Sequence, residues 1–428
     1  MHTASFMERC ADRYGEVFSV AMAGTDTGVW ISDPAAIKRL YARDKDNQVP
    51  PGTRPAIEPM FGPASVFLAA GAAHARKRRL LMPPFHGDRL ATWRERMTEA
   101  AEREVDGWNA PGPLTLGPRM AAVTEEIMFE VVFGLGEGPR QRQLRAALTS
   151  MVDASMRPGA LLLGFFAPSA WTRRLRPTPW GRLQRSIERT HALLREEIRT
   201  RRSDPGLEGR QDVFSLLAQA KDETGQPIGE EELLDELMSL LLAGAESSAT
   251  TLTWALHHLL RHPEACERLS SELDDGEGRY LDAVLQETMR LRPVAHLTAR
   301  RVTSPFEVSG YSLPAGTTVV VPAYVVHHRA DLYPDPKAFR PERFLEKPPG
   351  AFTWLPFGGG ARRCVGASFA MLEMRCVLAT IVRRVSMRPA RDAEERVTMR
   401  NIILTPSKRG RVIVDRVTPG GRAVKRAG

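Results

Sequence analysis

The segment that decides the fold is WLPFGGGARRCVGASFAMLEMRC, residues 354–376. Three consecutive glycines precede Cys364, and a helix-forming run over residues 367–380 follows Gly366. This order predicts a tight backbone loop that presents Cys364 at the N-terminus of a helix. The N–H groups and dipole of a helix N-terminus favour an anionic sulfur, and the two arginines before the cysteine add positive charge. The segment therefore predicts a thiolate, which suits a nucleophile or a ligand of a soft metal.

Two other interpretations of Cys364 are open on the residues alone. A nucleophilic cysteine needs a histidine base, and no histidine lies near it in the sequence, although one can still approach in space. A buried structural cysteine needs neither the three glycines nor the arginines. We therefore favour the metal ligand.

The composition restricts which classes of protein the chain can belong to. The chain has 428 residues, of which 43% are hydrophobic and 26% charged, as in a globular protein. Its four cysteines form no C-x-x-C pair, so neither a disulfide framework nor a zinc site is expected, and the location predicted is cytoplasmic. The net charge of +9 is compatible with an anionic partner, but no nucleic-acid-binding motif is visible. No signal peptide or membrane anchor is predicted.

The hydrophobic pattern predicts a mainly α protein with small β-sheets, forming one domain over residues 1–428. The longest helix is predicted over 230–261, and its nearly uncharged middle indicates burial on all sides. Glu246 is the single carboxylate in that middle part, so it must be paired, hydrated or functional. Turn residues between β-branched runs predict three hairpins, over 17–31, 306–324 and 402–414.

The segment FGGGARRCVG, residues 357–366, fits the pattern F-x-x-G-x-R-x-C-x-G at every fixed position. It resembles the haem-binding loop of the cytochrome P-450 family, which implies the P-450 fold and haem b as cofactor. The resemblance makes Cys364 the thiolate ligand of the haem iron, which favours O–O cleavage. The other residues of the loop that the resemblance places against the haem or the sulfur are Phe357, Gly358, Arg362 and Gly366.

Two further motifs follow in the order that the family requires. ETMR places Glu287 and Arg290 on one helix face, and FRPERF adds Arg343. The resemblance implies that these three residues form a salt-bridge network that is structural rather than catalytic. The alternative is a set of independent surface ion pairs.

The propionates of a haem need cations. The segment HARKR offers His74 and Arg78, and the resemblance adds Arg300 and Arg362 as further partners. Each of these residues can instead be an ordinary surface charge.

The predicted long helix carries AGAESS, residues 243–248, which resembles the family pattern A-G-x-[D/E]-T-[T/S]. The resemblance implies that Gly244 makes room for dioxygen and that Glu246 and Ser247 relay protons to it. The family usually has threonine where this chain has Ser247, and serine lacks the methyl group that fixes the rotamer. We therefore expect activity with more leakage to peroxide. The alternative is a buried helix that kinks at small residues.

The family topology places a mostly apolar set of residues around the substrate, which implies a fatty acid, terpenoid, steroid or polyketide. The set comprises Phe67, Leu240, Ala243, Ala295, Leu297 and Ile403, with His296 as a polar exception. The resemblance also implies a ferredoxin or flavodoxin-type electron donor with its reductase. Four cations, Arg76, Lys77, Arg79 and Arg363, either meet this donor or serve solubility.

The resulting hypothesis is a haem-thiolate monooxygenase that uses O2 to hydroxylate or epoxidise a hydrophobic small molecule. One rival is a peroxide-driven peroxygenase or a haem-thiolate isomerase, against which the acid–alcohol pair argues. A second rival is a non-enzymatic haem sensor, for which a chain of 428 residues leaves no room for a signalling segment.

Overall fold

The computed structural model describes residues 3–21, 27–50, 53–85, 87, 89–155, 178–276, 278–400 and 402–419. The α-helices in this part are α1 (Thr3–Tyr14), α2 (Pro34–Ala42), α3 (Thr53–Phe61), α4 (Gly71–Leu81), α5 (Arg89–Asp106), α6 (Leu116–Ile127), α7 (Pro139–Ser155), α9 (Pro179–Arg202), α10 (Val213–Gln219), α11 (Glu230–Leu259), α12 (Pro263–Asp274), α13 (Arg279–Leu291), α14 (Ala323–His327), α15 (Arg343–Glu346) and α16 (Ala367–Arg384). Short 3-10 turns are η1 (Pro83–Phe85), η4 (Leu207–Gly209) and η5 (Gly360–Arg362), and α6 continues into a π-helical turn, η2 (Met128–Val132).

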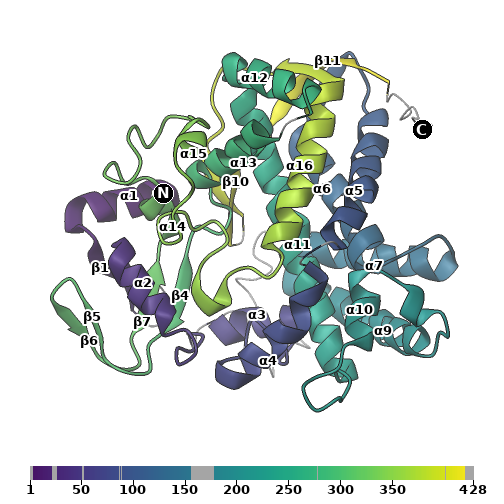
Figure 1. Ribbon diagram of the computed structural model, residues 1–428, viewed down its shortest axis with the longest axis horizontal. Coiled ribbons are helices and arrows are strands. Elements are labelled where there is room, and N and C mark those ends of the chain that lie inside the picture. The colour runs from purple at the N-terminus through teal and green to yellow at the C-terminus, as the bar shows by residue number, and fades with distance from the viewer. Residues whose placement is uncertain are drawn as a thin grey trace.

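The strands are short and gather mostly on one side of the molecule (Figure 1). They are β1 (Val17–Val20), β2 (Gly28–Ile31), β3 (Gly112–Thr115), β4 (Thr298–Arg301), β5 (Phe306–Val308), β6 (Tyr311–Leu313), β7 (Thr318–Val321), β8 (Val385–Pro389), β9 (Val397–Arg400), β10 (Ile403–Pro406) and β11 (Arg411–Val417). The largest sheet has the order β1-β2-β7-β4, in which β2 and β7 are parallel. The predicted class, mainly α with small sheets, is confirmed.

The three predicted hairpins have different outcomes. Strands β1 and β2 pair antiparallel as expected, although the turn over 22–26 lies outside the described residues. In the second region β5 pairs with β6, but β7 joins β2 and β4 instead. The third prediction is wrong, because β10 pairs with β9, whereas β11 pairs with β3 and β8. The reason is burial: Val412 and Val414 of β11 belong to the main core, so this strand pairs where that core lies.

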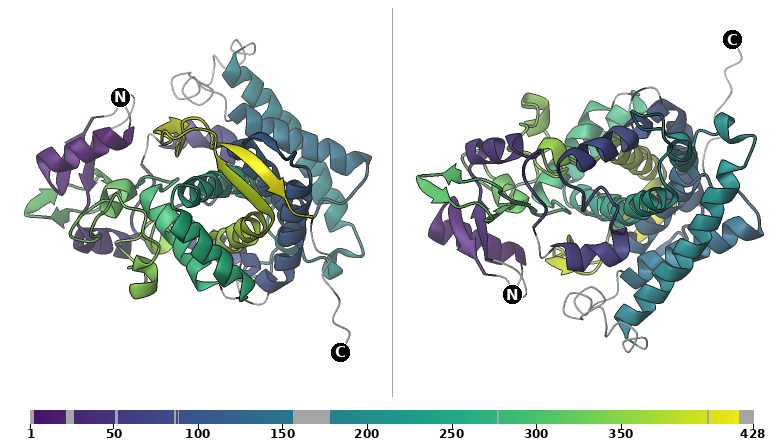
Figure 2. Two further views of the ribbon diagram at one scale, coloured as in Figure 1. Left: turned by 90° about the horizontal axis from the view of Figure 1, so that it is seen from above. Right: turned by 90° about the horizontal axis from the view of Figure 1, so that it is seen from below.

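Helix α11 is continuous from Glu230 to Leu259, two residues shorter than predicted at its C-terminus. Three glutamates in its first turn complement the helix dipole. Figure 2 shows α11 passing through the middle of the helical part, and within the described residues no helix is long and apolar enough to cross a membrane.

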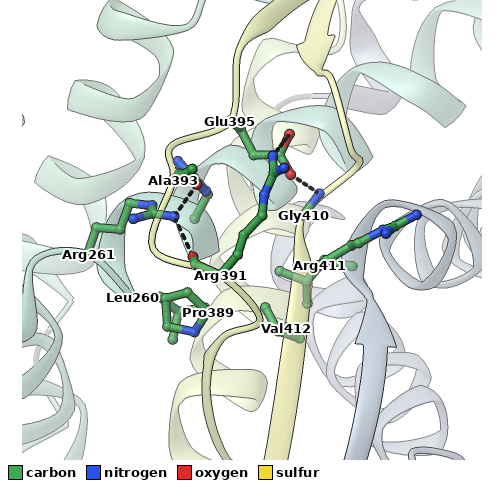
Figure 3. A pocket seen from close by; sticks show the side chains of 11 residues that line it. Leu260, Arg261, Pro389, Arg391, Ala393, Glu395, Gly410, Arg411 and Val412 are labelled. Atoms are coloured by element: carbon green, nitrogen blue, oxygen red, sulfur yellow. Dashed lines mark hydrogen bonds and ion pairs between the residues drawn. The ribbon is translucent and has the colours of Figure 1, made fainter.

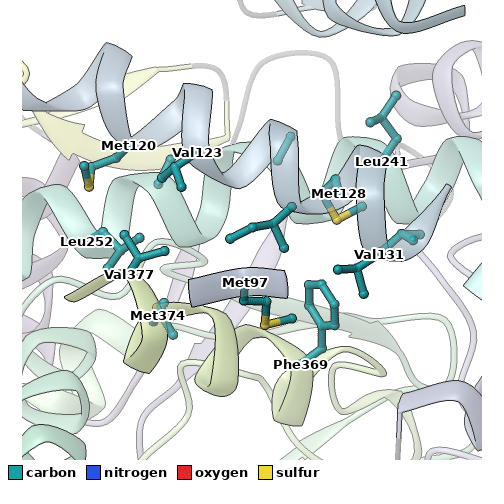
Figure 4. Close-up of a cluster of buried hydrophobic side chains, with 14 of the residues drawn as sticks. Met97, Met120, Val123, Met128, Val131, Leu241, Leu252, Phe369, Met374 and Val377 are labelled. Carbon is teal, nitrogen blue, oxygen red and sulfur yellow. The ribbon is translucent and has the colours of Figure 1, made fainter. Parts of the chain in front are cut away.

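The core forms where α5, α6, α11 and α16 meet (Figure 4). Each helix contributes apolar side chains at helical spacing, such as Met97 from α5, Val123 from α6, Leu252 from α11 and Phe369 from α16. This packing fixes α11 against α16, the helix that begins just after Cys364.

Candidate active site

The cysteine loop closes on itself before α16 begins. The N–H of Cys364 donates to the carbonyl of Phe357 at 2.9 Å, and Gly358 and Gly360 both take a φ of +66° that favours glycine. The N–H of Gly366 donates to the Cys364 sulfur, which lowers the pKa of the thiol, but burial by the surrounding protein outweighs it and raises that pKa. Cys364 as a residue keeps solvent-exposed surface although much protein surrounds its thiol.

Two of the three glycines are required by helix α2 and the turn that follows it, which pack on the loop. A Cβ atom on Gly359 would lie 2.5 Å from the Tyr41 ring, and one on Gly360 would lie 2.2 Å from an oxygen of Asp44. The Tyr41 hydroxyl shares a hydrogen bond of 2.9 Å with Thr298 in β4. Helix α2 and the turn after it therefore support the loop. No sequence motif predicts this role for Tyr41 or Asp44.

The structure joins the three members of the predicted salt-bridge network. Arg290 donates from Nε to Glu287 at 2.7 Å, and Arg343 donates from Nε to the same carboxylate at 3.0 Å. The side chains of Glu287 and Arg290 have no exposed surface, and that of Arg343 is 8% exposed. They are therefore not surface ion pairs.

His327 connects the network of Glu287, Arg290 and Arg343 to the chain just before the cysteine loop through hydrogen bonds. A guanidinium nitrogen of Arg290 donates to the carbonyl of His327 at 2.7 Å. Nε2 of His327 accepts from the N–H of Leu355 at 2.7 Å, so Nδ1 must carry the proton and donate to the carbonyl of Arg290 at 3.1 Å. Burial holds the pKa of His327 well below its usual value, which keeps the ring neutral. The histidine thus fixes the chain two residues before Phe357, and sequence reasoning missed it.

The four proposed propionate partners lie close enough to influence one another's charges. Arg78, Arg362 and Arg300 all contribute, after burial, to lowering the pKa of His74 to about 4. Arg300 is ion-paired with the buried Asp44 at 2.6 Å, which leaves it less available than the others.

Arg78 and Arg362 have no comparable acidic partner in the described residues. Their recorded hydrogen bonds to the main chain run to the carbonyls of Arg363 and Ala69, both at 2.6 Å. Nε of Arg362 is buried without a hydrogen-bond partner among the described residues. This surplus of positive charge beside an exposed cysteine fits a group that brings an iron and two carboxylates, as a haem does.

Helix α11 has an accessible stripe in the middle of its length. Ala243 is exposed, and Leu240, Gly244 and Ser247 are half-buried, at the spacing i, i+3, i+4 and i+7 of a single helix face. The Ser247 hydroxyl donates to the carbonyl of Ala243 at 2.8 Å. Glu246 points elsewhere, since its carboxylate accepts from Arg400 at 3.2 Å. The acid and the alcohol are therefore not hydrogen-bonded to each other here.

Gly244 has a packing role that the sequence did not suggest. A Cβ atom at this position would lie 3.0 Å from the sulfur of Met128 in the π-helical turn. One residue further on, the hydroxyl of Thr124 in α6 donates to the carbonyl of Ala245 at 2.8 Å. These contacts bring α6 against α11 at the predicted relay, and the role of Gly244 in admitting dioxygen stays a prediction.

The predicted substrate residues range from exposed to buried. Phe67 is 42% exposed and its ring lies tilted against that of Phe61, and Ala295 is also exposed. Leu297 and Ile403 are half-buried. Burial lowers the pKa of His296 to about 4, and its Nδ1 has no hydrogen-bond partner in the described part of the chain. The apolar stretch 160–166, which we also expected near the substrate, lies outside the described residues.

Three of the four cations considered for the electron donor already have acidic partners. Arg76 and Lys77 both bind Glu232 at the start of α11, and Arg79 lies 2.8 Å from Glu223. Arg363, next to the cysteine, is exposed. These ion pairs weaken the attraction that Arg76, Lys77 and Arg79 can offer to an acidic protein.

Comparison with known proteins defines the class. The fold is similar to that of the cyanobacterial CYP120A1 with bound retinoic acid, with a TM-score of 0.84, 24% identity, and coverage of 97% of this chain and 95% of that one. Cytochrome P450 135B1 of Mycobacterium tuberculosis is 38% identical over 419 residues, covering 96% of this chain and 87% of the relative. Cytochrome P450 138 of the same species is 32% identical, covering 95% and 91%.

The sequence profile of Cytochrome P450 matches residues 1–414. The chain belongs to the cytochrome P450 family. Membership implies haem bound through a cysteine thiolate, monooxygenase chemistry with O2, an electron-transfer partner and a hydrophobic substrate.

Proposed function

We propose that this chain binds haem b through Cys364 and hydroxylates or epoxidises a fatty acid, terpenoid, steroid or polyketide. The observation that carries the proposal is Cys364, an exposed residue on a loop braced by Gly366 and by the buried network around Glu287. Bound haem supplies the reductive activation of O2. The chain itself must hold the haem, exclude water and deliver protons.

His74, Arg78 and Arg362 would hold the haem carboxylates, with Arg300 behind them in its ion pair with Asp44. Phe357 is half-buried and packs edge-on against Trp354, so it would cover the sulfur side. Gly358 takes a positive φ, which gives the loop the tight turn that would leave room for the haem.

Glu246 and Ser247 would move protons on the opposite side of the haem. Burial raises the pKa of Glu246, which helps the carboxyl carry a proton near neutral pH, while Arg400 and Arg409 oppose this. The Ser247 hydroxyl lies on the accessible stripe of α11 and can accept one proton while it donates another.

The electron source that we propose is a ferredoxin or flavodoxin with its reductase. Arg363 is the cation best placed for contact, since it is exposed beside the cysteine. We also propose a cytoplasmic location, which the four free cysteines support.

The decisive experiment is the carbon monoxide difference spectrum of the reduced protein, compared with that of Cys364→Ala. A strongly red-shifted Soret band that disappears in the variant is expected for thiolate ligation. A band typical of histidine ligation, unchanged in the variant, would overturn the ligand and with it the proposed activity.

Turnover experiments then separate the monooxygenase from its rivals. Fatty acids, screened by spin-state change, would be incubated with O2, NADPH, a ferredoxin and its reductase. A peroxygenase would instead form product with peroxide alone and form none with O2, NADPH and the reductase system.

A further inference from the structure

A buried ion pair between Asp44 and Arg300 lies against the cysteine loop. The carboxylate belongs to the turn after α2 and the guanidinium to β4, and their side chains are 1% and 5% exposed. Nε of Arg300 donates to Oδ1 of Asp44 at 2.6 Å, and Nη2 donates to Oδ2 at 3.1 Å. Two parallel bonds of this kind make a strong arginine–carboxylate pair, so each charge compensates the other.

The same pair touches two glycines of the cysteine loop. Nη2 of Arg300 also donates to the carbonyl of Gly359, at 3.4 Å. Oδ2 of Asp44 lies so close to Gly360 that a Cβ atom there would be 2.2 Å away. The ring of Tyr41 completes the contact, with its centroid 5.1 Å from the guanidinium carbon of Arg300. The pair thus connects β4 and the turn after α2 to the loop.

Little of the Arg300 guanidinium is left for a ligand. A guanidinium has five N–H groups. Arg300 already makes four hydrogen bonds: two to Asp44, one to the carbonyl of Gly359, and one from Nη1 to the carbonyl of Ala299 at 3.1 Å. Because its charge is also compensated, Arg300 is a poor site for a second carboxylate.

Arg78 and Arg362 are in the opposite situation. Within the described ranges neither is ion-paired, and their main-chain bonds go to neutral carbonyls. His74 adds no charge at neutral pH, because burial, with help from Arg362 and Arg78, lowers its pKa to about 4. The two uncompensated arginines therefore match the two carboxylates of a haem in number and in charge.

We propose that Asp44 is a positioning residue that withdraws Arg300 from the haem carboxylates and fastens it to the cysteine loop. The carboxylates are bound by Arg78 and Arg362, whose charges they balance. Without Asp44, Arg300 would place a third positive charge beside the haem and would no longer be held against Gly359. This inference rests on the haem site proposed above, and it divides the cations of that site into those that bind the haem and one that supports the loop.

The first test compares haem with its dimethyl ester, in which both carboxylates are uncharged. The affinity of the full-length apoprotein for each compound is measured by absorbance titration. Arg78→Gln and Arg362→Gln should each weaken haem binding roughly tenfold and weaken binding of the ester much less, because a charge-assisted hydrogen bond is lost only with haem. Arg300→Gln should weaken both by the same factor. Discrimination in R300Q as large as in R362Q would overturn the proposal.

The second test is the reduction potential of the haem iron. Asp44→Asn leaves the Arg300 charge unpaired and should raise the potential, because a nearby cation opposes removal of an electron from ferrous iron. Arg300→Gln leaves Asp44 unpaired and should lower it. The double variant D44N/R300Q keeps the net charge of wild type and should return to the wild-type potential. A purely structural role predicts shifts of one sign that do not cancel, and that result would contradict the proposal.

The double variant also decides the question if an unpaired buried charge prevents either single variant from folding. It contains no unpaired charge, so it should bind haem. It should keep the wild-type potential and the wild-type ratio of affinities for haem and its ester. A departure in either quantity would show that Arg300 itself acts on the haem carboxylates.

The matched control is Arg261→Gln. This arginine also braces the main chain, since it donates to the carbonyls of Arg391, Asp392 and Ala393 in the turn between β8 and β9 (Figure 3). Its loss should leave the potential and the ratio of affinities as in wild type. A shift of the potential in R261Q equal to that in R300Q would mean that loss of any bracing arginine has this effect, and would overturn the proposal.

These readouts separate the inference from the proposed function. Strong discrimination by R300Q in a protein whose reduced carbon monoxide complex keeps the red-shifted band would overturn the role of Asp44 alone. Absence of that band in wild type would instead contradict the proposed function, whatever binds the carboxylates.

Discussion

The two sides of the proposed haem site are built in opposite ways. On the cysteine side, Glu287 and Arg290 are fully buried and are joined to each other by two hydrogen bonds, at 2.7 and 2.9 Å. On the α11 side, Glu246 accepts a single bond of 3.2 Å from an arginine that is 32% exposed. The difference teaches that the part that would ligate iron is made rigid, whereas the part that would move protons is left adjustable.

The largest expected effect comes from breaking the rigid side. Glu287→Gln leaves Arg290 and Arg343 buried without a full counter-charge, which costs about 3–5 kcal/mol of the free energy of unfolding. Urea unfolding and haem content would both report it.

The control for this experiment is Glu231→Gln. Glu231 is 64% exposed and pairs with Arg195 on the surface, so its loss should cost less than about 1 kcal/mol. Equal losses in the two variants would show that the buried network is no stronger than a surface pair.

A second, smaller effect on stability is expected where α16, on the cysteine side, contacts α11. Glu373 of α16 is fully buried, makes a hydrogen bond with Ser248 of α11, and has its pKa raised by burial to about 8. The unfolded chain ionises this group near 4.5, so stability should fall as the pH rises from about 4.5 to about 8. Glu373→Gln should remove that loss, by about 1.4 kcal/mol per pKa unit at most.

Thermal unfolding of wild type and Glu373→Gln across this pH range measures the effect. The variant should gain melting temperature relative to wild type toward pH 8 and match it near pH 4.5. A difference that does not change with pH would contradict the assignment of a protonated Glu373.

The smallest effect is expected on the adjustable side. Ser247→Ala removes the hydroxyl that passes the proton, so product per NADPH should fall by roughly tenfold with more peroxide. Ser247→Thr restores the hydroxyl and fixes its rotamer, and should yield at least as much product as wild type. Neither change should alter the carbon monoxide spectrum. A loss that is the same in both variants would point to packing rather than to proton transfer.

Local patterns predicted what depends on neighbours in the sequence. The glycine-rich loop, the start of α16 and the course of α11 follow from spacing and helix signals within a few turns. Glu287 and Arg290 share a helix face, so their ion pair also follows from spacing.

The partners that come from distant segments could not be predicted in this way. His327 supports the loop through one ring nitrogen and one carbonyl, and Asp44 acts from the turn after α2, more than 300 residues upstream of the loop. Arg400 reaches Glu246 across 154 residues. The third hairpin was wrong because a turn pattern does not decide which neighbour a strand pairs with, whereas burial of β11 does.

The contact of α2 with the glycine loop sets a boundary for protein engineering. A side chain added at Gly359 or Gly360 would overlap Tyr41 or Asp44, and Asp44 is also the partner of Arg300. Single substitutions at these glycines therefore disturb α2, the buried pair of Asp44 with Arg300 and the loop that carries the proposed haem ligand. Variant libraries meant to change the surroundings of the proposed thiolate ligand should vary Phe357 or Val365. They should change the glycines only in combination with residues of α2.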